Sequence, residues 1–572
     1  MRGRGPLLFI PLAALLAVLP SLAKGISCGH DLAFHLRSWL EVASQWRQGV
    51  PIPHWDFTAA WNSGEPRFIF YPPLSWTLGA LLEVLLPWAA VPAVFLWLTL
   101  TACGFTMYRL ARLWATPGNS VAAAAFFMVN PYMLFVLYER AAYAELLAAA
   151  WIPLVLLAVL RSRPRVSGIA VSVALLWLTS APAAAMGCYA LALVTAGRLA
   201  WGWRSARSAR SLLEEAAAIA AGALLGLGLA GFYLAPATYE QRWVHIRMPF
   251  LAGVRYQDNF LFGREGTASH VAILRTVSFC ALALLGCVGI FAAAAGAETL
   301  RGHRNGDRGR SIACLALLAA MAGFLLTSPS APFWRHIPWL VYLQFPWRIC
   351  AILGACAAAL LALALPGRQS SAPAFLALAG VLAGVLAFTM AGDRWFRQFC
   401  HPGQTGRELA EGFYTGSLRD AYDDYNPIGS DPAALGRNNP AYWLAPNPGA
   451  AAPGEGSGNP GGYSVLLARR LHVAVSAPAA EFLILNLRDY PVWRVTINGR
   501  PAAERAPRKD GLIALPIAAG PSRIDIAYRW PADQIAGWAA TLLSVAALSL
   551  SRAFGAAWRG PGASRFRSAA GG

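Results

Sequence analysis

The chain has 572 residues, of which 57% are hydrophobic and 13% charged, and its formal net charge is +19. With a mean hydropathy of +0.46 it is too apolar for a soluble protein of this length, and we predict a polytopic α-helical membrane protein. The excess of Lys and Arg lies mostly between apolar segments, which is typical of membrane topology and argues against nucleic-acid binding.

The N-terminus combines Arg2 and Arg4 with an apolar segment, residues 6–23, that ends in Ser-Leu-Ala. This pattern is typical of a cleaved signal peptide and also compatible with a retained first span. The residues alone leave both interpretations open.

A polar loop, residues 24–90, comes next and begins with the signals of a surface helix. Asp31 and His35 are four residues apart and therefore share one helix face. Apolar residues at helical spacing predict that this helix lies on the membrane surface. Asp31 is then either an N-cap of the helix or a residue with a chemical role.

Residues 72–88 decide the predicted topology. This segment is flanked by prolines, carries Glu83 and falls short of the roughly 20 apolar residues that a span needs. We therefore predict a surface or re-entrant helix. About twelve spans then remain, near 6–23, 91–110, 119–137, 145–160, 167–180, 183–200, 214–233, 271–297, 311–327, 347–365, 373–391 and 534–550.

The charges of the loops orient these spans. Loops on one side are rich in Arg and poor in acidic residues, whereas the others are nearly balanced. By the positive-inside rule the Arg-rich side, with both termini, is cytoplasmic. The predicted domains are a transmembrane domain (1–391), an extracytoplasmic domain (392–532) and a last span with a basic cytoplasmic tail (533–572).

The segment 392–532 is predicted to be β-rich, because it contains short apolar runs and none long enough to span. Asn498-Gly499 is a strong hairpin signal, and residues 446–462 form a Pro- and Gly-rich flexible loop. The predicted strands are 464–467, 471–475, 482–487, 493–497 and 524–528.

The nine cysteines show no CxxC spacing and lie mostly inside apolar segments, as small core residues do. Cys28 and Cys400 lie outside the predicted spans. The sequence leaves open whether these two form a disulfide in an oxidising compartment.

The first loop resembles a known family. Its DxxxH helix and the following "W…G…P…FYPPL" resemble the first outer loop of the GT-C superfamily of membrane glycosyltransferases. The branch is the one catalogued as 6-pyruvoyl-tetrahydropterin synthase-related bacterial membrane proteins. The run "YPxW…INGRP…LPIxAGPSRIDIAYRW" resembles the outer domain of that branch, which implies a β-sandwich over the membrane core. The resemblance also favours a retained first span and implies that Asp31 is the catalytic base.

The second outer loop, residues 138–145, carries further candidates. The resemblance implies a second acid here, and Glu145 matches it by position, with Glu139 and Arg140 beside the substrate. Helix-dipole stabilisation is the alternative role of Glu145. His30 and His35 flank Asp31 and either orient it or help to hold a divalent metal, although no tight ligand spacing is visible.

Four other positions complete the predicted site. Arg348, in the run QFPWR at the mouth of a span, either reaches the interface or binds phosphate, and the resemblance favours phosphate. Trp61 and Tyr71 belong to the opening motif. Glu240, in the long loop 236–270, is either a sugar-binding residue or a solvated loop charge.

Together with these residues, the resemblance implies an inverting GT-C-type glycosyltransferase of the bacterial inner membrane. It would transfer a sugar from a polyprenyl-phosphate donor to a glycan, lipid or protein acceptor on the outer face. The alternative is a non-catalytic GT-C-like protein in envelope polysaccharide assembly or transport. The sequence identifies neither the sugar, the acceptor and the lipid carrier nor the oligomeric state.

Overall fold

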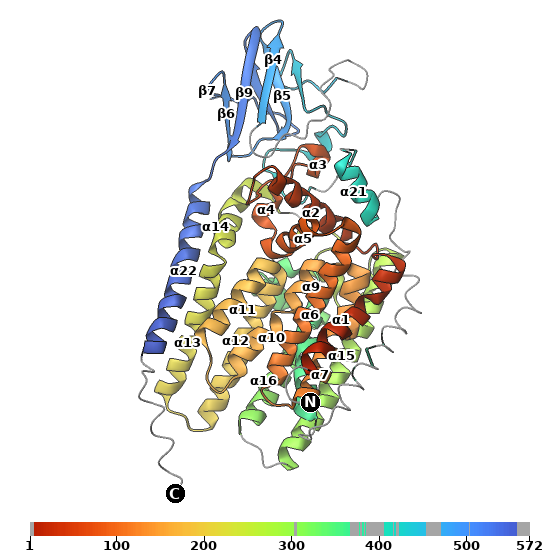
Figure 1. Ribbon diagram of the computed structural model, residues 1–572, viewed down its shortest axis with the longest axis vertical. Coiled ribbons are helices and arrows are strands. Elements are labelled where there is room, and N and C mark those ends of the chain that lie inside the picture. Colours follow the sequence, from red (N-terminus) through yellow and green to blue (C-terminus); the bar gives the residue numbers. More distant parts are fainter. Residues whose placement is uncertain are drawn as a thin grey trace.

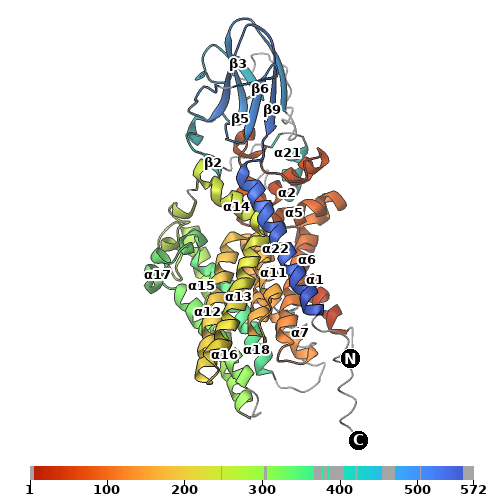
Figure 2. The same cartoon turned by 90° about the vertical axis from the view of Figure 1, so that its left-hand side faces the viewer.

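The computed structural model describes residues 5–246, 248–301, 306–365, 377, 380, 381, 384, 405–415, 417, 418, 423–453, 471–502 and 504–557. A bundle of long helices carries a β-rich domain at one end (Figure 1). Two shorter helices, α2 (Leu32–Arg47) and α5 (Pro73–Leu85), lie between the bundle and the strands in both views (Figures 1 and 2).

The bundle consists of apolar helices in chain order. They are α1 (Gly5–Lys24), α6 (Val91–Ala111), α7 (Pro117–Val129), α8 (Pro131–Leu134), α9 (Tyr143–Ala149), α10 (Ile152–Leu160), α11 (Val166–Thr179), α12 (Ala181–Arg204), α13 (Ala209–Leu229), α14 (Gly231–Tyr239), α15 (Ala268–Arg301), α16 (Gly306–Leu325), α17 (Ala331–His336), α18 (Cys350–Ala364) and α22 (Ala532–Ala557). The last helix, α22, returns from the β domain and packs along α13 and α14.

Within the described residues, eight helices are long and apolar enough to cross a membrane, or nine if one bent pair counts as a span. The predicted count of about twelve is not confirmed. Residues 6–23 and 167–180 also lie in apolar helices, α1 of 20 residues and α11 of 14 residues, which are not among these eight. The predicted span 373–391 lies almost entirely outside the described residues.

The predicted span 119–137 is not straight. Pro117–Val129 and Pro131–Arg140 meet at an angle of 43°. Pro131 has no N–H to continue the helix, and the side chain of Asn130 accepts hydrogen bonds from the N–H groups of Tyr132 and Met133, both at 3.2 Å. Asn130 therefore starts a new helix, and the chain bends at this residue.

Residues 72–88 contain α5, which is only 13 residues long and packs on α2. A Cβ atom on Gly79 of α5 would lie 2.2 Å from Cδ2 of Trp39 in α2, so only glycine allows this approach. Glu83 of α5 is 4% exposed and forms an ion pair with Arg47 at 2.6 Å. Glu83, the acidic residue that argued against a membrane span here, is thus neutralised by Arg47 of the neighbouring helix α2.

The β domain contains two antiparallel sheets that share one buried apolar cluster, the arrangement of a β-sandwich. One sheet has the order β3 (Tyr442–Ala445), β5 (Glu481–Arg488), β8 (Leu512–Ile517), and the other has the order β4 (Leu471–Ala477), β9 (Gly520–Tyr528), β6 (Trp493–Ile497), β7 (Arg500–Pro501). The predicted hairpin between β6 and β7 is present, with positive φ at Asn498 and Gly499. The predicted strand 464–467 lies outside the described residues.

Strands β3 and β8 were not predicted from the sequence. Pro516 lies in β8, and proline argues against a strand. The strand nevertheless forms at the edge of its sheet, where proline is tolerated.

The first loop is anchored in the β domain. It contains α3 (Ala59–Asn62) and α4 (Arg67–Phe70), and its side chains Trp55, Phe57 and Phe70 belong to the apolar cluster of the two sheets. The short pair β1 (Val244–His245) and β2 (Asn426–Pro427) and the helix α21 (Gly406–Tyr414) complete this layer. Cys28 is disulfide-bonded, and Cys400 lies outside the described residues.

Candidate functional site

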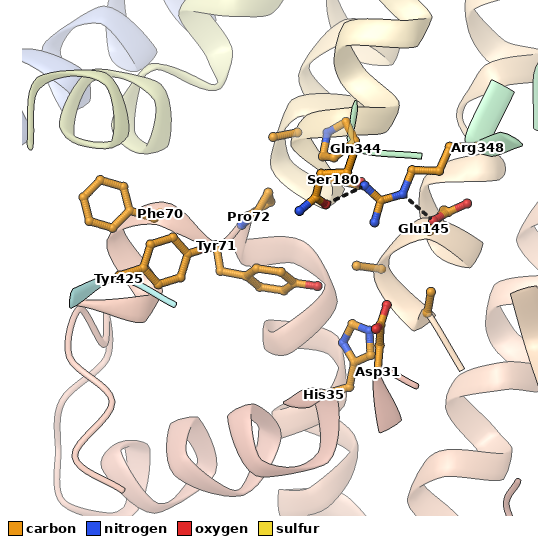
Figure 3. A pocket seen from close by; sticks show the side chains of 14 residues that line it. Asp31, His35, Phe70, Tyr71, Pro72, Glu145, Ser180, Gln344, Arg348 and Tyr425 are labelled. Atoms are coloured by element: carbon orange, nitrogen blue, oxygen red, sulfur yellow. Dashed lines mark hydrogen bonds and ion pairs between the residues drawn. The ribbon is translucent and has the colours of Figure 1, made fainter. Parts of the chain in front are cut away.

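A cavity of about 210 Å³ lies where the first loop meets the end of the helical bundle (Figure 3). Six separate parts of the chain contribute to its wall. The lining residues are Asp31, His35, Phe70, Tyr71, Pro72, Ala142, Ala144, Glu145, Ser180, Ala181, Pro182, Gln344, Arg348 and Tyr425.

Asp31 is held in this cavity by the second loop. Arg140 Nη2 donates to Asp31 Oδ2 at 2.7 Å, and the backbone N–H of Asp31 donates to the carbonyl of Arg140 at 2.9 Å. Asp31 precedes α2 but makes no side-chain capping hydrogen bond. The Asp31 carboxylate therefore does not cap α2, which was one of the two roles that the sequence allowed.

The Asp31 carboxylate stays ionised while remaining accessible. Burial opposes its ionisation, but the positive charge and the hydrogen bond of Arg140, with a smaller effect of Arg348, outweigh burial and lower the pKa of Asp31. Its side chain is still 37% exposed, so a molecule in the cavity can reach it.

The two loops approach so closely because of local backbone features. A Cβ atom on Gly29 would lie 2.6 Å from Cβ of Ala141, so glycine is required there. Ala141 has a left-handed conformation with φ of 47° and ends a π-helical turn, Phe135–Arg140. This turn places Arg140 against the ring of Trp347, with 4.8 Å from Cζ to the ring centroid.

His35 is fixed by α9. Its Nε2 accepts the backbone N–H of Tyr143 at 3.0 Å, and its ring stacks on that of Tyr143 with centroids 5.4 Å apart. Burial lowers the pKa of His35 to about 4, so the ring is neutral at pH 7 and carries its proton on Nδ1.

This histidine does not fit the metal ligand considered from the sequence. The Nε2 lone pair is already engaged by the Tyr143 N–H. Within the described residues there is also no group of three or more His, Cys, Asp or Glu side chains that could hold a metal ion.

Glu145 and Arg348 form the second ion pair of the cavity. Arg348 Nε donates to Glu145 Oε2 at 3.1 Å, and the hydroxyl of Tyr132 donates to Oε1. Arg348 Nη1 donates to the carbonyl of Leu343 at 2.8 Å and to Gln344 Oε1 at 3.1 Å (Figure 3). Nη2 of Arg348 has no hydrogen-bond partner in the described part of the chain, so it can bind an anion in the cavity.

Five of the predicted site residues, including the Arg140 described above, do not line this cavity. Trp61 lies in the layer under the β domain, where its carbonyl accepts from Asn486 at 3.3 Å and Arg437 covers its ring. The imidazole of His30 and the carboxylate of Glu139 are also outside the lining. His30 and Glu139 were predicted because they are close in sequence to Asp31 and Glu145. Closeness in sequence within a loop does not determine the direction of a side chain.

Glu240 is another of these five, and its side chain is fully buried. Tyr490 donates to its Oε2 at 2.9 Å and Gln534 to its Oε1 at 3.3 Å. Its side chain thereby connects the loop after α14 to the β domain and to α22. Burial raises the pKa of Glu240 to about 8, which fits a structural acid better than a sugar-binding one.

The structure also adds residues that the sequence did not indicate. Tyr425 comes from the segment before β2, and its ring stacks on Phe70 with centroids 5.1 Å apart and an interplanar angle of 19°. Together with Tyr71 these rings form an aromatic wall of the cavity (Figure 3). Gln344 has φ of 61° and ψ of −54°, a strained conformation that turns its amide toward Arg348. No local motif marks Tyr425, whereas Gln344 is the first residue of the run QFPWR that contains Arg348.

Comparisons with known proteins give little guidance. No protein-family model matches the chain, and no curated protein matches it. Two solved structures are similar, both of the arabinofuranosyltransferase AftD from Mycobacteria. The first has 20% identity and a TM-score of 0.40 and covers 70% of this chain, and a mutant of the same enzyme has 18% identity, a TM-score of 0.41 and the same coverage.

This chain corresponds to only 28% and 29% of the length of those two structures. Similarity at this level carries no argument about activity. The branch named from the sequence resemblance likewise stays a prediction. What the chain itself establishes is a polytopic helical membrane protein with a β-rich C-terminal region.

Proposed function

We propose that this protein is a membrane glycosyltransferase that moves a sugar from a polyprenyl-phosphate-linked donor to an acceptor hydroxyl. The observation that carries the proposal is that an ionised, accessible Asp31 and an anchored Arg348 line one cavity. Such a transfer needs a base for the acceptor and a cation for the phosphate.

Asp31 is the proposed base. The acceptor oxygen attacks the anomeric carbon, its proton passes to the Asp31 carboxylate, and the bond from that carbon to the phosphate oxygen breaks. The phosphate leaves with the electron pair, and the configuration at the anomeric carbon inverts. Because the phosphate is a good leaving group, a carboxylate of lowered pKa suffices as base. Arg140 positions Asp31 through the 2.7 Å hydrogen bond.

Arg348 is the proposed ligand of the donor phosphate, through its Nη2 and its charge. Both oxygens of Glu145 accept hydrogen bonds, from Arg348 and from Tyr132. We therefore assign Glu145 to positioning Arg348 and not to proton transfer, which differs from the catalytic role implied by the sequence resemblance. The aromatic wall of Phe70, Tyr71 and Tyr425 is the proposed surface for the sugar ring.

The topology belongs to the proposal as well. The helices α2 and α9, which contribute to the cavity, lie toward the β-domain end of the bundle, while the Arg-rich connection between α12 and α13, residues 204–210, lies at the other end (Figure 1). By the positive-inside rule the cavity and the β domain face the outside of a bacterial inner membrane. The acceptor is then a glycan, lipid or protein of the cell envelope.

The test is an assay of the full-length protein in proteoliposomes with radiolabelled synthetic polyprenyl-phosphate pentoses and hexoses and envelope extracts as acceptor. Asp31→Asn keeps the side-chain size but cannot accept the proton. We expect wild-type protein to form product and Asp31→Asn to be slower by roughly 10²–10⁴-fold, at equal membrane level. Product formation by Asp31→Asn at the wild-type rate would refute the base and favour a non-catalytic role in polysaccharide assembly.

A matched variant separates the two acids of the cavity. Glu145→Gln retains the shape of the side chain but weakens the hold on Arg348. We expect it to raise KM for the donor more than it lowers kcat. A loss of kcat as large as that of Asp31→Asn would show instead that Glu145 takes part in proton transfer.

A further inference from the structure

A second cavity, of about 470 Å³, lies in the helical bundle away from the candidate active site. It is formed by the C-terminal end of α12, the following turn and the first residues of α16, at the end of the bundle opposite the β domain (Figures 1 and 2). Its charged lining residues are Arg198, Arg207, Asp307 and Arg310.

Two of the three arginines share one carboxylate. Arg198 and Arg207 both form ion pairs with Glu215, the latter at 2.8 Å from Nη1 to Oε2. Arg198 is also fixed by the carbonyls of Val159 and Ser162, at 2.9 and 2.8 Å. A single negative charge thus balances two positive charges on this wall.

Arg310 belongs to α16, another helix that lines the cavity, and has unused donors. Its Nη1 forms an ion pair with Asp307 at 3.0 Å, and its side chain is only 9% exposed. Its Nε and Nη2 are buried and have no hydrogen-bond partner among the residues that the structure describes. Buried charged donors without an acceptor are costly, so this wall favours a ligand that supplies acceptor oxygens.

The cavity therefore combines excess positive charge, unused arginine donors and a volume that accommodates several oxygen atoms. The carboxylates near the cavity already have partners. Glu215 pairs with Arg198 and Arg207, and Asp307 Oδ2 accepts a hydrogen bond from the hydroxyl of Ser162 at 3.1 Å. Phosphate oxygens match arginine donors in geometry and charge. Basic cavities between helices at the cytoplasmic side of membrane proteins suit anionic headgroups.

We propose that this cavity is a phosphate-binding site, independent of the proposed transferase activity, in which Arg310 is the principal ligand. The guanidinium of Arg310 turns toward the cavity and donates from Nε and Nη2 to phosphate oxygens, while Arg207 approaches from the turn after α12. The phosphate is either that of an anionic lipid headgroup or that of a soluble phosphate ester.

The experiment has two arms, both on the full-length protein and read as the thermal unfolding midpoint. In the first arm, inorganic phosphate is titrated against chloride at constant ionic strength, in neutral detergent. In the second, protein in nanodiscs of phosphatidylglycerol is compared with protein in nanodiscs of phosphatidylcholine. A response in the first arm alone identifies a soluble phosphate ester, and a response in the second alone identifies a lipid headgroup.

Arg310→Gln should weaken the phosphate response about tenfold or more, or abolish the difference between the two lipids. Arg210→Gln is the matched control, because it removes the same charge from a side chain that is 90% exposed and outside the cavity. If Arg310→Gln does not accumulate, Arg207→Gln replaces it. Equal responses of wild-type protein and the cavity variant in both arms would refute the phosphate site. The donors of Arg310 would then be hydrated by water.

Discussion

Nη2 of Arg140 lies 2.7 Å from Oδ2 of Asp31, and the backbone of Asp31 is bonded to the carbonyl of the same arginine. One residue of the second loop thus fixes both the position and the ionisation of the proposed base. This pair and the pair of Glu145 with Arg348 hold the cavity from two sides, and they lead to separate predictions.

Arg140→Gln should shift the pH dependence of transfer. Burial raises the pKa of Asp31 and Arg140 lowers it, so removing the arginine raises the pKa of the base. The acid limb of kcat/KM should move upward by one or more pH units, measured between about pH 3 and 8. Arg210→Gln serves as the charge control and should not shift the limb. An unshifted limb in Arg140→Gln would mean that Asp31 is not the titrating base.

The buried histidine of α2 should make the protein sensitive to mild acid. The pKa of His35 in the fold is about 4, below its ordinary 6.5, so its neutral form is stabilising above pH 6.5 and that contribution is lost progressively as the pH falls toward 4. At pH 5 the loss amounts to about 2 kcal/mol. Comparing unfolding midpoints at pH 7.5 and 5.0, His35→Gln should lose less stability than wild type. An equal loss would assign the acid sensitivity to other groups, such as His30, whose pKa burial also lowers.

Arg348→Lys should impair use of the donor. Lysine keeps the charge but lacks the planar set of donors that contacts Glu145, Leu343 and Gln344 at once. We expect KM for the polyprenyl-phosphate sugar to rise about tenfold, with a smaller effect on KM for the acceptor. Arg210→Lys, at an exposed position, is the control for the substitution itself. An unchanged donor KM would leave only an interfacial role for Arg348.

Gly29→Ala should separate the two loops of the site. The added Cβ would lie 2.6 Å from Cβ of Ala141, and overpacking of this kind costs roughly 1–3 kcal/mol. We expect a lower unfolding midpoint together with reduced transfer. Gly286→Ala is a suitable control, since a Cβ there meets nothing within 4 Å. Wild-type stability in Gly29→Ala would show that the loops tolerate a wider spacing.

Topology can be tested by labelling single cysteines introduced after Arg165 and after Pro453 in a background from which the exposed native cysteines are removed. A membrane-impermeant reagent applied to intact cells should label the position after Pro453 and not the one after Arg165. The reason is that Arg-rich loops stay in the cytoplasm. Labelling of the position after Arg165 but not of the one after Pro453 would mean that α5, although only 13 residues long, crosses the membrane, because one additional crossing reverses the side of every later loop.

The sequence alone determined the features that depend on local pattern. Runs of apolar residues predicted most helices, the short and interrupted run 72–88 predicted a helix outside the set of long spans, and Asn498-Gly499 predicted the hairpin between β6 and β7. These features follow from hydrogen bonding and side-chain burial within one segment, so a single segment carries their signal.

Only the tertiary structure decided which distant groups meet. The approach of Gly29 to Ala141 brings Asp31 to Arg140, and the bend at Asn130 precedes the turn that carries Arg140. Tyr425 lines the cavity although it is distant in sequence from the other lining residues. Glu240, a candidate sugar-binding residue by sequence, instead accepts hydrogen bonds from Tyr490 and Gln534. Contacts of this kind depend on how separate segments pack, and no pattern within one segment encodes the direction in which its side chains find partners.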